Sequence, residues 1–161
     1  MSNELSFKSV GIKTDDPNLF KEVQINPIGI KTPVELSTKR SGLFKMHYSV
    51  PDQIADNLRN LILTNYGERL GRYDYGANLR PLAFELTSLA EWEAEVMIRI
   101  NTAVSKFMPF VDLQTFSSEV LAQKMSDSGQ SLSHMRINIK FSVPKVGLNN
   151  RQMSIGIWCV G

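Results

Sequence analysis

The period at which apolar residues recur changes along this chain, and that change limits its fold more than any other feature. In the middle of the sequence, apolar side chains recur every three or four positions, which is the period of an amphipathic helix. From His134 to Val143 every second residue is apolar, which is the period of a strand with one buried face. The order of the two periods predicts an α+β domain, with helices packed on one face of a sheet.

A first helix is predicted from about Ser49 to Asn65. Ser49 suits the cap, Pro51 suits the first turn, and Asp52 suits the positive end of the helix dipole. Gly67 follows the helix and can adopt the positive φ that ends many helices. The apolar face of this helix consists of Ile54, Leu58, Leu61 and Ile62.

Two further helices are predicted before the strands, which makes about three in all. A short one is expected over residues 77–85, although Pro81 restricts it to a few turns. Thr87 or Ser88 caps a longer one, and Pro109 ends it. The apolar stripe of the longer helix is Leu89, Trp92, Val96, Ile100, Val104 and Phe107.

The last third of the chain predicts a mainly antiparallel β-meander. Its strands are expected at Val111–Ala122, His134–Val143 and Met153–Val160, with a turn at residues 126–129. Residues 1–42 form instead an extended arm with short strands, because prolines interrupt the apolar runs there and lack the N–H that a central strand needs. These prolines are Pro17, Pro27 and Pro33. One more short strand is expected between Leu43 and Tyr48.

Composition excludes several classes of protein. Lys and Arg number 18 against 16 Asp and Glu, and a net charge of only +2 disfavours a nucleic-acid partner. The longest apolar run, Met153–Val160, is far shorter than the roughly 18 residues of a membrane span, and the N-terminus shows no secretory signal. With Cys159 as the sole cysteine and two distant histidines, His47 and His134, we expect no disulfide, metal site or cofactor. Cys159 lies on the apolar side of its strand and is interpreted as a small core residue.

A glycine-punctuated loop at residues 67–76 contains the charged residues most relevant to chemistry. Glu68, Asp74 and the nearby Glu85 allow an acid/base pair in principle, but interleaved arginines favour a network of ion pairs. The loop follows a helix and lacks the Lys-Ser/Thr of a phosphate-binding loop. Its tyrosines, Tyr73 and Tyr75, suit either a protein–protein contact or the domain's own core.

Four short motifs in order give the chain a resemblance to a known family. The helix segment 53–64 is followed by Gly67-Glu68-Arg69, then Asp74-Tyr75-Gly76, then Leu82-Ala83-Phe84-Glu85. This series resembles the baseplate wedge and sheath-initiator family of contractile-tailed phages, which includes the W tail protein and the type VI secretion baseplate E component. The resemblance covers residues 43–145. Many relatives carry prolines where this chain has Leu70 and Tyr73, so its loop is less constrained by sequence.

The resemblance implies a non-enzymatic structural protein with no catalytic residues. Its expected partners are sheath protein arms and other baseplate wedge proteins, with tail tube or hub proteins as further candidates. Its expected place is the virion tail baseplate, after synthesis in the host cytoplasm. Strands would be added by main-chain hydrogen bonding along the meander between Val111 and Val143. The motif positions expected to hold contacts are Gly67, Glu68, Arg69, Tyr75, Gly76, Phe84 and Glu85.

The resemblance also divides the chain and leaves two other functions open. Residues 1–42 are the arm, residues 43–145 the sheath-initiator-like domain, and residues 146–161 a C-terminal strand extension. One alternative is a cell-wall-degrading glycosidase that uses Glu68 or Glu85. The other is the equivalent part of a type VI secretion or other contractile injection system.

Overall fold

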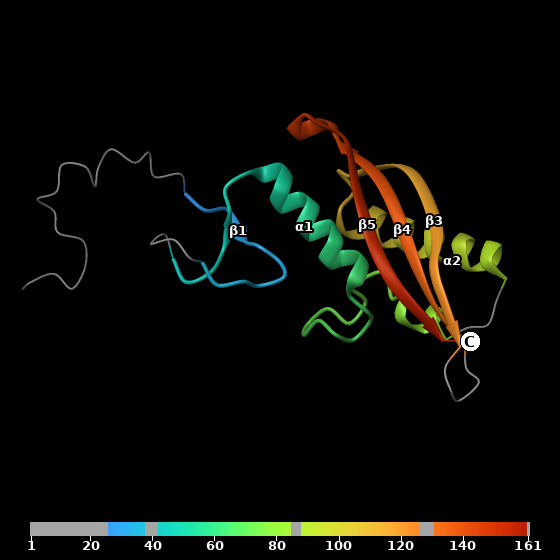
Figure 1. Ribbon diagram of the computed structural model, residues 1–161. Coiled ribbons are helices and arrows are strands. Elements are labelled where there is room, and N and C mark those ends of the chain that lie inside the picture. Colours follow the sequence, from blue (N-terminus) through green and yellow to red (C-terminus); the bar gives the residue numbers. More distant parts are fainter. Residues whose placement is uncertain (1–25, 38–41, 85–87, 126–130, 161) are drawn as a thin grey trace, which may run out of the picture.

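The computed structural model describes residues 26–37, 42–84, 88–125 and 131–160 (Figure 1). Helices precede a three-stranded antiparallel sheet, so the α+β prediction is confirmed. The helical elements are α1 (Val50–Leu63), the 3₁₀ turn η1 (Arg80–Ala83), α2 (Leu89–Phe107) and the 3₁₀ turn η2 (Pro144–Val146). The strands are β1 (Gly29–Ile30), β2 (Met46–His47), β3 (Asp112–Met125), β4 (Ser131–Val143) and β5 (Leu148–Val160).

The main sheet has the strand order β3-β4-β5, with both pairings antiparallel. Strand β4 is central, and its alternation acts as predicted, since one set of side chains is buried and the other faces away. The buried set is Met135, Ile137, Ile139, Phe141 and Val143. Strand β5 begins earlier than the predicted Met153 and pairs with β4 from Leu148 onward. The turn predicted at residues 126–129 lies outside the described residues.

Helix α1 follows its sequence pattern closely. All four residues of its predicted apolar face are buried, and they pack into one core with the inner face of β4. Pro51 lies in the first turn, where its missing N–H has no helical partner to lose. The helix ends at Leu63, two residues before the predicted limit, and Ser49 occupies the cap position without a side-chain capping bond.

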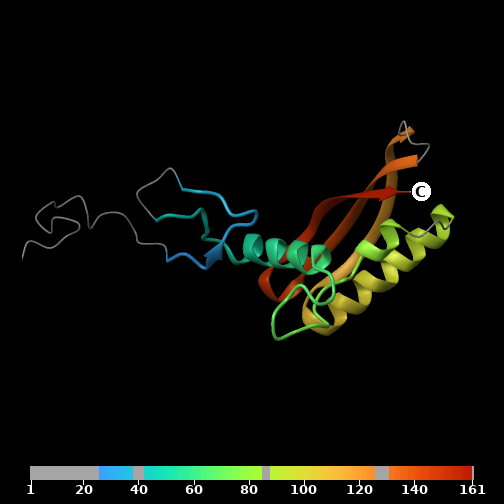
Figure 2. The same cartoon turned by 90° about the horizontal axis from the view of Figure 1, so that it is seen from below.

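Helix α2 begins with a complete capping box. The Ser88 hydroxyl accepts from the Glu91 amide, and the Glu91 carboxylate accepts from the Ser88 amide. Most of the predicted apolar stripe is buried, but Leu89 in the first turn is half exposed. The indole N–H of Trp92 donates to the Leu82 carbonyl at 3.1 Å, which fixes α2 against η1. Figure 2 shows α1 and α2 on the same side of the main sheet.

The predicted third helix over residues 77–85 is wrong. Only the 3₁₀ turn Arg80–Ala83 forms in the described part of that segment. Asn78 has a φ of 51°, which is incompatible with a right-handed helix. Pro81 has no N–H to donate to the hydrogen bonds of a longer helix. The turn still buries Leu82 and Ala83, so the segment contributes to the core without being an α-helix.

The arm and the segment that follows it form a hairpin, which is a second, separate sheet. Strands β1 and β2 pair antiparallel, and a bridge joins Leu36 to Phe44, so the strand expected from Leu43 to Tyr48 is only partly formed. Figures 1 and 2 show this hairpin extending beyond the start of α1, away from the main sheet. Pro17 and the apolar run at residues 23–25 lie outside the described residues.

Two polar contacts with Asp56 hold the hairpin against α1. The Thr32 amide donates to Asp56 Oδ2 at 2.8 Å, and His47 Nε2 is hydrogen-bonded to the same oxygen at 2.6 Å. Burial acts to raise the pKa of Asp56, but the hydrogen bonds from His47 and Thr32 outweigh it and hold this pKa below its ordinary value. The carboxylate is therefore the point at which both strands of the arm are fixed to the domain.

Candidate functional site

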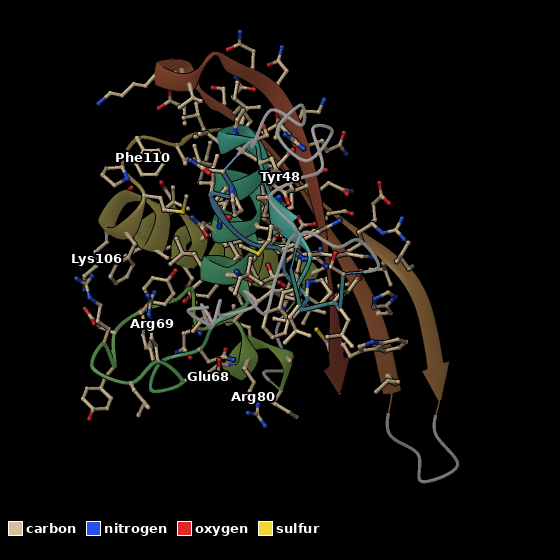
Figure 3. All side chains as sticks on the ribbon, turned by 90° about the vertical axis from the view of Figure 1, so that its left-hand side faces the viewer. Tyr48, Glu68, Arg69, Arg80, Lys106 and Phe110 are labelled. Atoms are coloured by element: carbon tan, nitrogen blue, oxygen red, sulfur yellow. The ribbon has the colours of Figure 1, made fainter. Side chains whose placement is uncertain are left out.

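The loop that joins α1 to η1 brings together five of the seven motif residues predicted as a site. Gly67, Glu68, Arg69, Tyr75 and Gly76 all lie in it, and Figure 3 shows Glu68 and Arg69 on the same side of the molecule. Phe84 follows η1 and lies in a different surface, described below. Glu85 lies outside the described residues, so the structure gives no distance between its carboxyl group and that of Glu68.

Glu68 closes the start of the loop. Its carboxylate accepts from the Asn65 amide at 2.8 Å and from the Asn65 side-chain amide at 2.9 Å. The Asn65 side-chain oxygen in turn accepts from the Arg80 amide at 3.0 Å, which links the loop to η1. The bonds from Asn65 hold the pKa of Glu68 below its ordinary value, whereas a general acid at neutral pH needs a raised pKa. The geometry thus gives Glu68 the role of a bracing residue.

Arg69 and Tyr75 connect the loop to α2. The Arg69 guanidinium carbon lies 4.2 Å from the centre of the Tyr75 ring, and the Tyr75 ring packs on Phe107 with centroids 4.9 Å apart. The sequence left Tyr75 open between an interface and a core role, and the structure makes it a partly buried member of the core edge.

An ion pair beside this stack adds a second connection to α2. Lys106 Nζ donates to Asp74 Oδ2 at 2.5 Å, and this bond holds the pKa of Asp74 below its ordinary value. The network of ion pairs expected between the loop carboxylates and the interleaved arginines is not found among the described residues, where Asp74 pairs with a lysine on α2 (Figure 3) and Glu68 bonds Asn65.

Gly67 and Gly76 each satisfy a different backbone requirement. Gly67 has a φ of 85° and donates its amide to the Tyr73 carbonyl at 2.8 Å, which closes the loop on itself. Gly76 has a φ of 117°, and a Cβ there would lie 2.1 Å from the Thr64 carbonyl oxygen. The loop therefore returns to the end of α1 at a distance that only glycine allows.

Sequence reasoning missed two residues that hold the far end of the loop. Asn78 has a positive φ, and its carbonyl accepts from Arg99 Nη1 on α2 at 2.8 Å. Arg99 also donates to Glu95 at 2.7 Å, so its side chain has a fixed direction. The single signal in the sequence was the Asn itself, since Asn tolerates positive φ better than most residues.

The loop at residues 67–76, called the braced loop from here on, presents two large side chains to solvent at its tip. Leu70 is 94% exposed and Tyr73 is 73% exposed. Because hydrogen bonds and the stack on α2 fix the surrounding backbone, the loop offers an ordered apolar and aromatic surface.

Phe84 lines a groove of about 290 Å³ between η1, the end of α1 and strand β5. Its neighbours there include Leu63, Arg80 and Trp158, and Leu63, Phe84 and Trp158 are about half exposed or more, whereas the groove residues Ile62, Leu79 and Ala83 are buried. The sequence predicted Phe84 as a contact residue but gave no sign of this groove, because its walls come from residues far apart in the chain.

The described residues show no metal centre and no helix that could span a membrane. No group of three or more His, Cys, Asp or Glu side chains among them is arranged to hold a metal ion. Neither described helix is both long and apolar enough to cross a bilayer. Burial raises the pKa of the Cys159 thiol, and its sulfur lies 3.7 Å from that of Met135, so this cysteine packs at the core as predicted. His134 stacks on Trp158 with ring centres 4.3 Å apart.

No protein-family model and no curated protein sequence matches the chain. Several solved structures are similar, including the following three. A chain of the anti-feeding prophage baseplate, from a six-fold symmetrised cryo-EM structure, is 22% identical with a TM-score of 0.54, over 70% of this chain and 81% of that one. A Geobacter sulfurreducens protein named as a tail lysozyme is 19% identical with a TM-score of 0.45, over 68% and 89%. A chain of the postcontracted pyocin R2 baseplate is 17% identical with a TM-score of 0.40, over 78% and 97%. The first of these shows that the chain shares its fold with a chain of the anti-feeding prophage baseplate.

Proposed function

We propose that this protein is a structural component of a contractile-tail baseplate, of the sheath-initiator type, and joins the baseplate to the first sheath ring. The observation that carries this proposal is the agreement between the motif series and the fold. The motif series resembles that family, and the fold is shared with a chain of the anti-feeding prophage baseplate over most of both chains. The proposed site is the virion tail baseplate.

In the proposed mechanism, two surfaces of the protein act together. The braced loop presents Leu70 and Tyr73 to another baseplate wedge protein, and Glu68 and Arg69 keep the loop in one conformation. An edge of the main sheet accepts an extended arm of the sheath protein, because main-chain bonds give affinity and alternating side chains fix the register. A protein with both surfaces would set the position of the first sheath subunits. Tail tube or hub proteins are further proposed neighbours.

The proposed role is non-enzymatic. Supporting it, the Glu68 carboxylate is occupied by Asn65 and has a lowered pKa, which is the reverse of a glycosidase general acid. The same structural role applies in a type VI secretion or other contractile injection system, and the neighbouring genes would distinguish these hosts.

Cryo-EM of assembled tails tests the proposal directly. We expect one density for this chain at the junction between the baseplate and the first sheath ring, with the loop tip buried against a neighbour. Density for the chain elsewhere in the particle, or none at all, would overturn the proposal.

A further inference from the structure

The two edges of the main sheet differ in how well they are protected against strand addition. Edge strands of soluble proteins are usually blunted by charges, prolines or β-bulges. Strand β3 has such devices, because its pairing with β4 is interrupted at Leu113/Thr115 and at Val120/Ala122, and it carries Asp112 and Glu119.

Strand β5 has none of these protective features over its last nine residues. Residues 152–160 contain no charged residue and no proline. Their pairing with β4 continues without a bulge from Phe141↔Arg151 to Leu132↔Val160. Among the described residues, no main-chain hydrogen bond is made from β5 to any element besides β4 and its own turn. This edge is therefore long, regular and uncharged. These are the properties of an edge with which another strand can pair.

The groove beside the β5 edge adds apolar surface at the same place. Phe84 is 64% exposed and Trp158 is 53% exposed, and both line it together with Leu63. Gly156 and Ile157 of β5 also line it, so the groove and the strand edge form one continuous surface. Figure 3 shows Arg80 near the same end of the sheet, and it is the one charged residue among the described residues that line the groove.

We infer that β5, and not β3 or the central β4, is the edge that accepts the added strand, and that the strand is an extended apolar segment of another protein. This inference rests on the proposed function. Successive side chains of an added strand point to opposite faces, so every second one would enter the groove beside Phe84. A carboxylate in that segment matches Arg80, and a lysine or arginine there is excluded by like charge. The strand region expected from the sequence alone, Val111 to Val143, is thereby replaced by a strand outside it.

Site-specific cross-linking on assembled tails tests this assignment with a matched pair of positions. Gln152 on β5 and Thr115 on β3 both pair with Lys140 of β4, so they flank the same row of the sheet on opposite edges. The photo-cross-linking residue p-benzoylphenylalanine replaces Gln152 in one preparation and Thr115 in the other, and mass spectrometry identifies the adducts.

We expect an adduct at position 152 with an extended segment of a different tail protein, and none at position 115. An adduct at position 115 alone overturns the inference and leaves the baseplate role intact. An adduct at position 152 with a second copy of this chain also overturns it, because the added strand then comes from this protein and not from a different one. The absence of adducts at both positions in a baseplate that contains the chain rules out strand addition at either edge. A chain missing from the baseplate overturns the proposed function itself.

A second pair of variants tests the groove. Phe84→Lys is expected to lower retention of the first sheath ring on purified baseplates about tenfold or more, because it puts a charge where an apolar side chain should bind. Val120→Lys, at a residue 49% exposed on β3, is the control and should leave retention unchanged. Thermal unfolding confirms that both variants fold. Equal retention by two folded variants would contradict the inference.

Discussion

Arg69 lies over the ring of Tyr75, with its guanidinium carbon 4.2 Å from the ring centre. Because Tyr75 in turn packs on Phe107 of α2, this one contact joins the tip of the loop to the longest helix of the domain. The arginine acts here as a brace on the outside of the fold, and its removal should alter the loop more than the core.

The first prediction concerns this brace. Arg69→Ala should lower global stability by only about 1 kcal/mol or less, since the contact is exposed, yet should reduce incorporation of the protein into baseplates several-fold. Arg151→Ala is the control, because it removes an exposed ion pair with Asp52 at 2.5 Å that lies away from the loop. Incorporation is measured by quantitative mass spectrometry of purified tails. Similar incorporation of both variants would argue against a role for the loop in contacts.

The second prediction concerns the return of the loop to α1. Gly76→Ala would place a Cβ 2.1 Å from the Thr64 carbonyl oxygen, so either the loop or the end of α1 must move. We expect a loss of about 2–4 kcal/mol in the free energy of unfolding, measured with denaturant. Gly71→Ala is the matched control, because Gly71 also has a positive φ but has open space around it, and should cost only about 1 kcal/mol. Equal losses would mean that the close approach to Thr64 is unimportant.

The third prediction concerns the pH dependence of the arm. The lowered pKa of Asp56 means that its carboxylate stabilises the folded arm above the ordinary pKa of 3.8, and that this stabilisation is lost as the pH falls through the lower folded-state value. The protection of the hairpin amides, corrected for the slower intrinsic exchange at low pH, should therefore fall in acid before that of the β4 amides does. In Asp56→Asn the exchange should be fast already at neutral pH, with a weaker acid dependence. An unchanged exchange rate in this variant would show that other contacts hold the arm.

The fourth prediction separates the bracing role of Glu68 from a catalytic one. The purified protein should release no soluble fragments from peptidoglycan, and Glu68→Gln should leave that result unchanged. The variant should nevertheless loosen the loop, because a neutral amide accepts more weakly from Asn65 than a carboxylate does. Loop order is measured by amide exchange at residues 65–75. Peptidoglycan turnover that Glu68→Gln abolishes would instead support the glycosidase alternative.

The sequence predicted those elements whose form depends on local periodicity. The apolar face of α1 and the alternation of β4 are both found as expected, because helix and strand geometry alone determines which positions face the core. The expected helix over residues 77–85 failed for an equally local reason, the positive φ of Asn78 beside Pro81. Asn tolerates both right-handed and left-handed backbone conformations. The conformation of Asn78 therefore depended on its contact with the Arg99 side chain, which is distant in sequence.

The candidate site was predicted only where it lies within one stretch of chain. The motif residues from Gly67 to Gly76 share a loop because they are close in sequence, but their contacts were not predicted, since Glu68 bonds Asn65 and Arg69 stacks on Tyr75. The groove was not foreseeable, because Phe84 and Trp158 meet only through the packing of η1 on β5. Long-range packing of this kind leaves no periodic signal in a single sequence.

The way in which the hairpin is attached to α1 determines how easily it separates from the rest of the molecule. Among the described residues, no residue of the hairpin belongs to the buried core, and the polar contacts that Thr32 and His47 make with α1 converge on Asp56 and Asn60. Net contributions of about 1 kcal/mol per hydrogen bond would let the hairpin detach in roughly one molecule in a hundred while the rest stays folded. The hairpin and the domain are then separate cooperative units within one chain. Detachment of the hairpin would therefore leave the main sheet and its core intact.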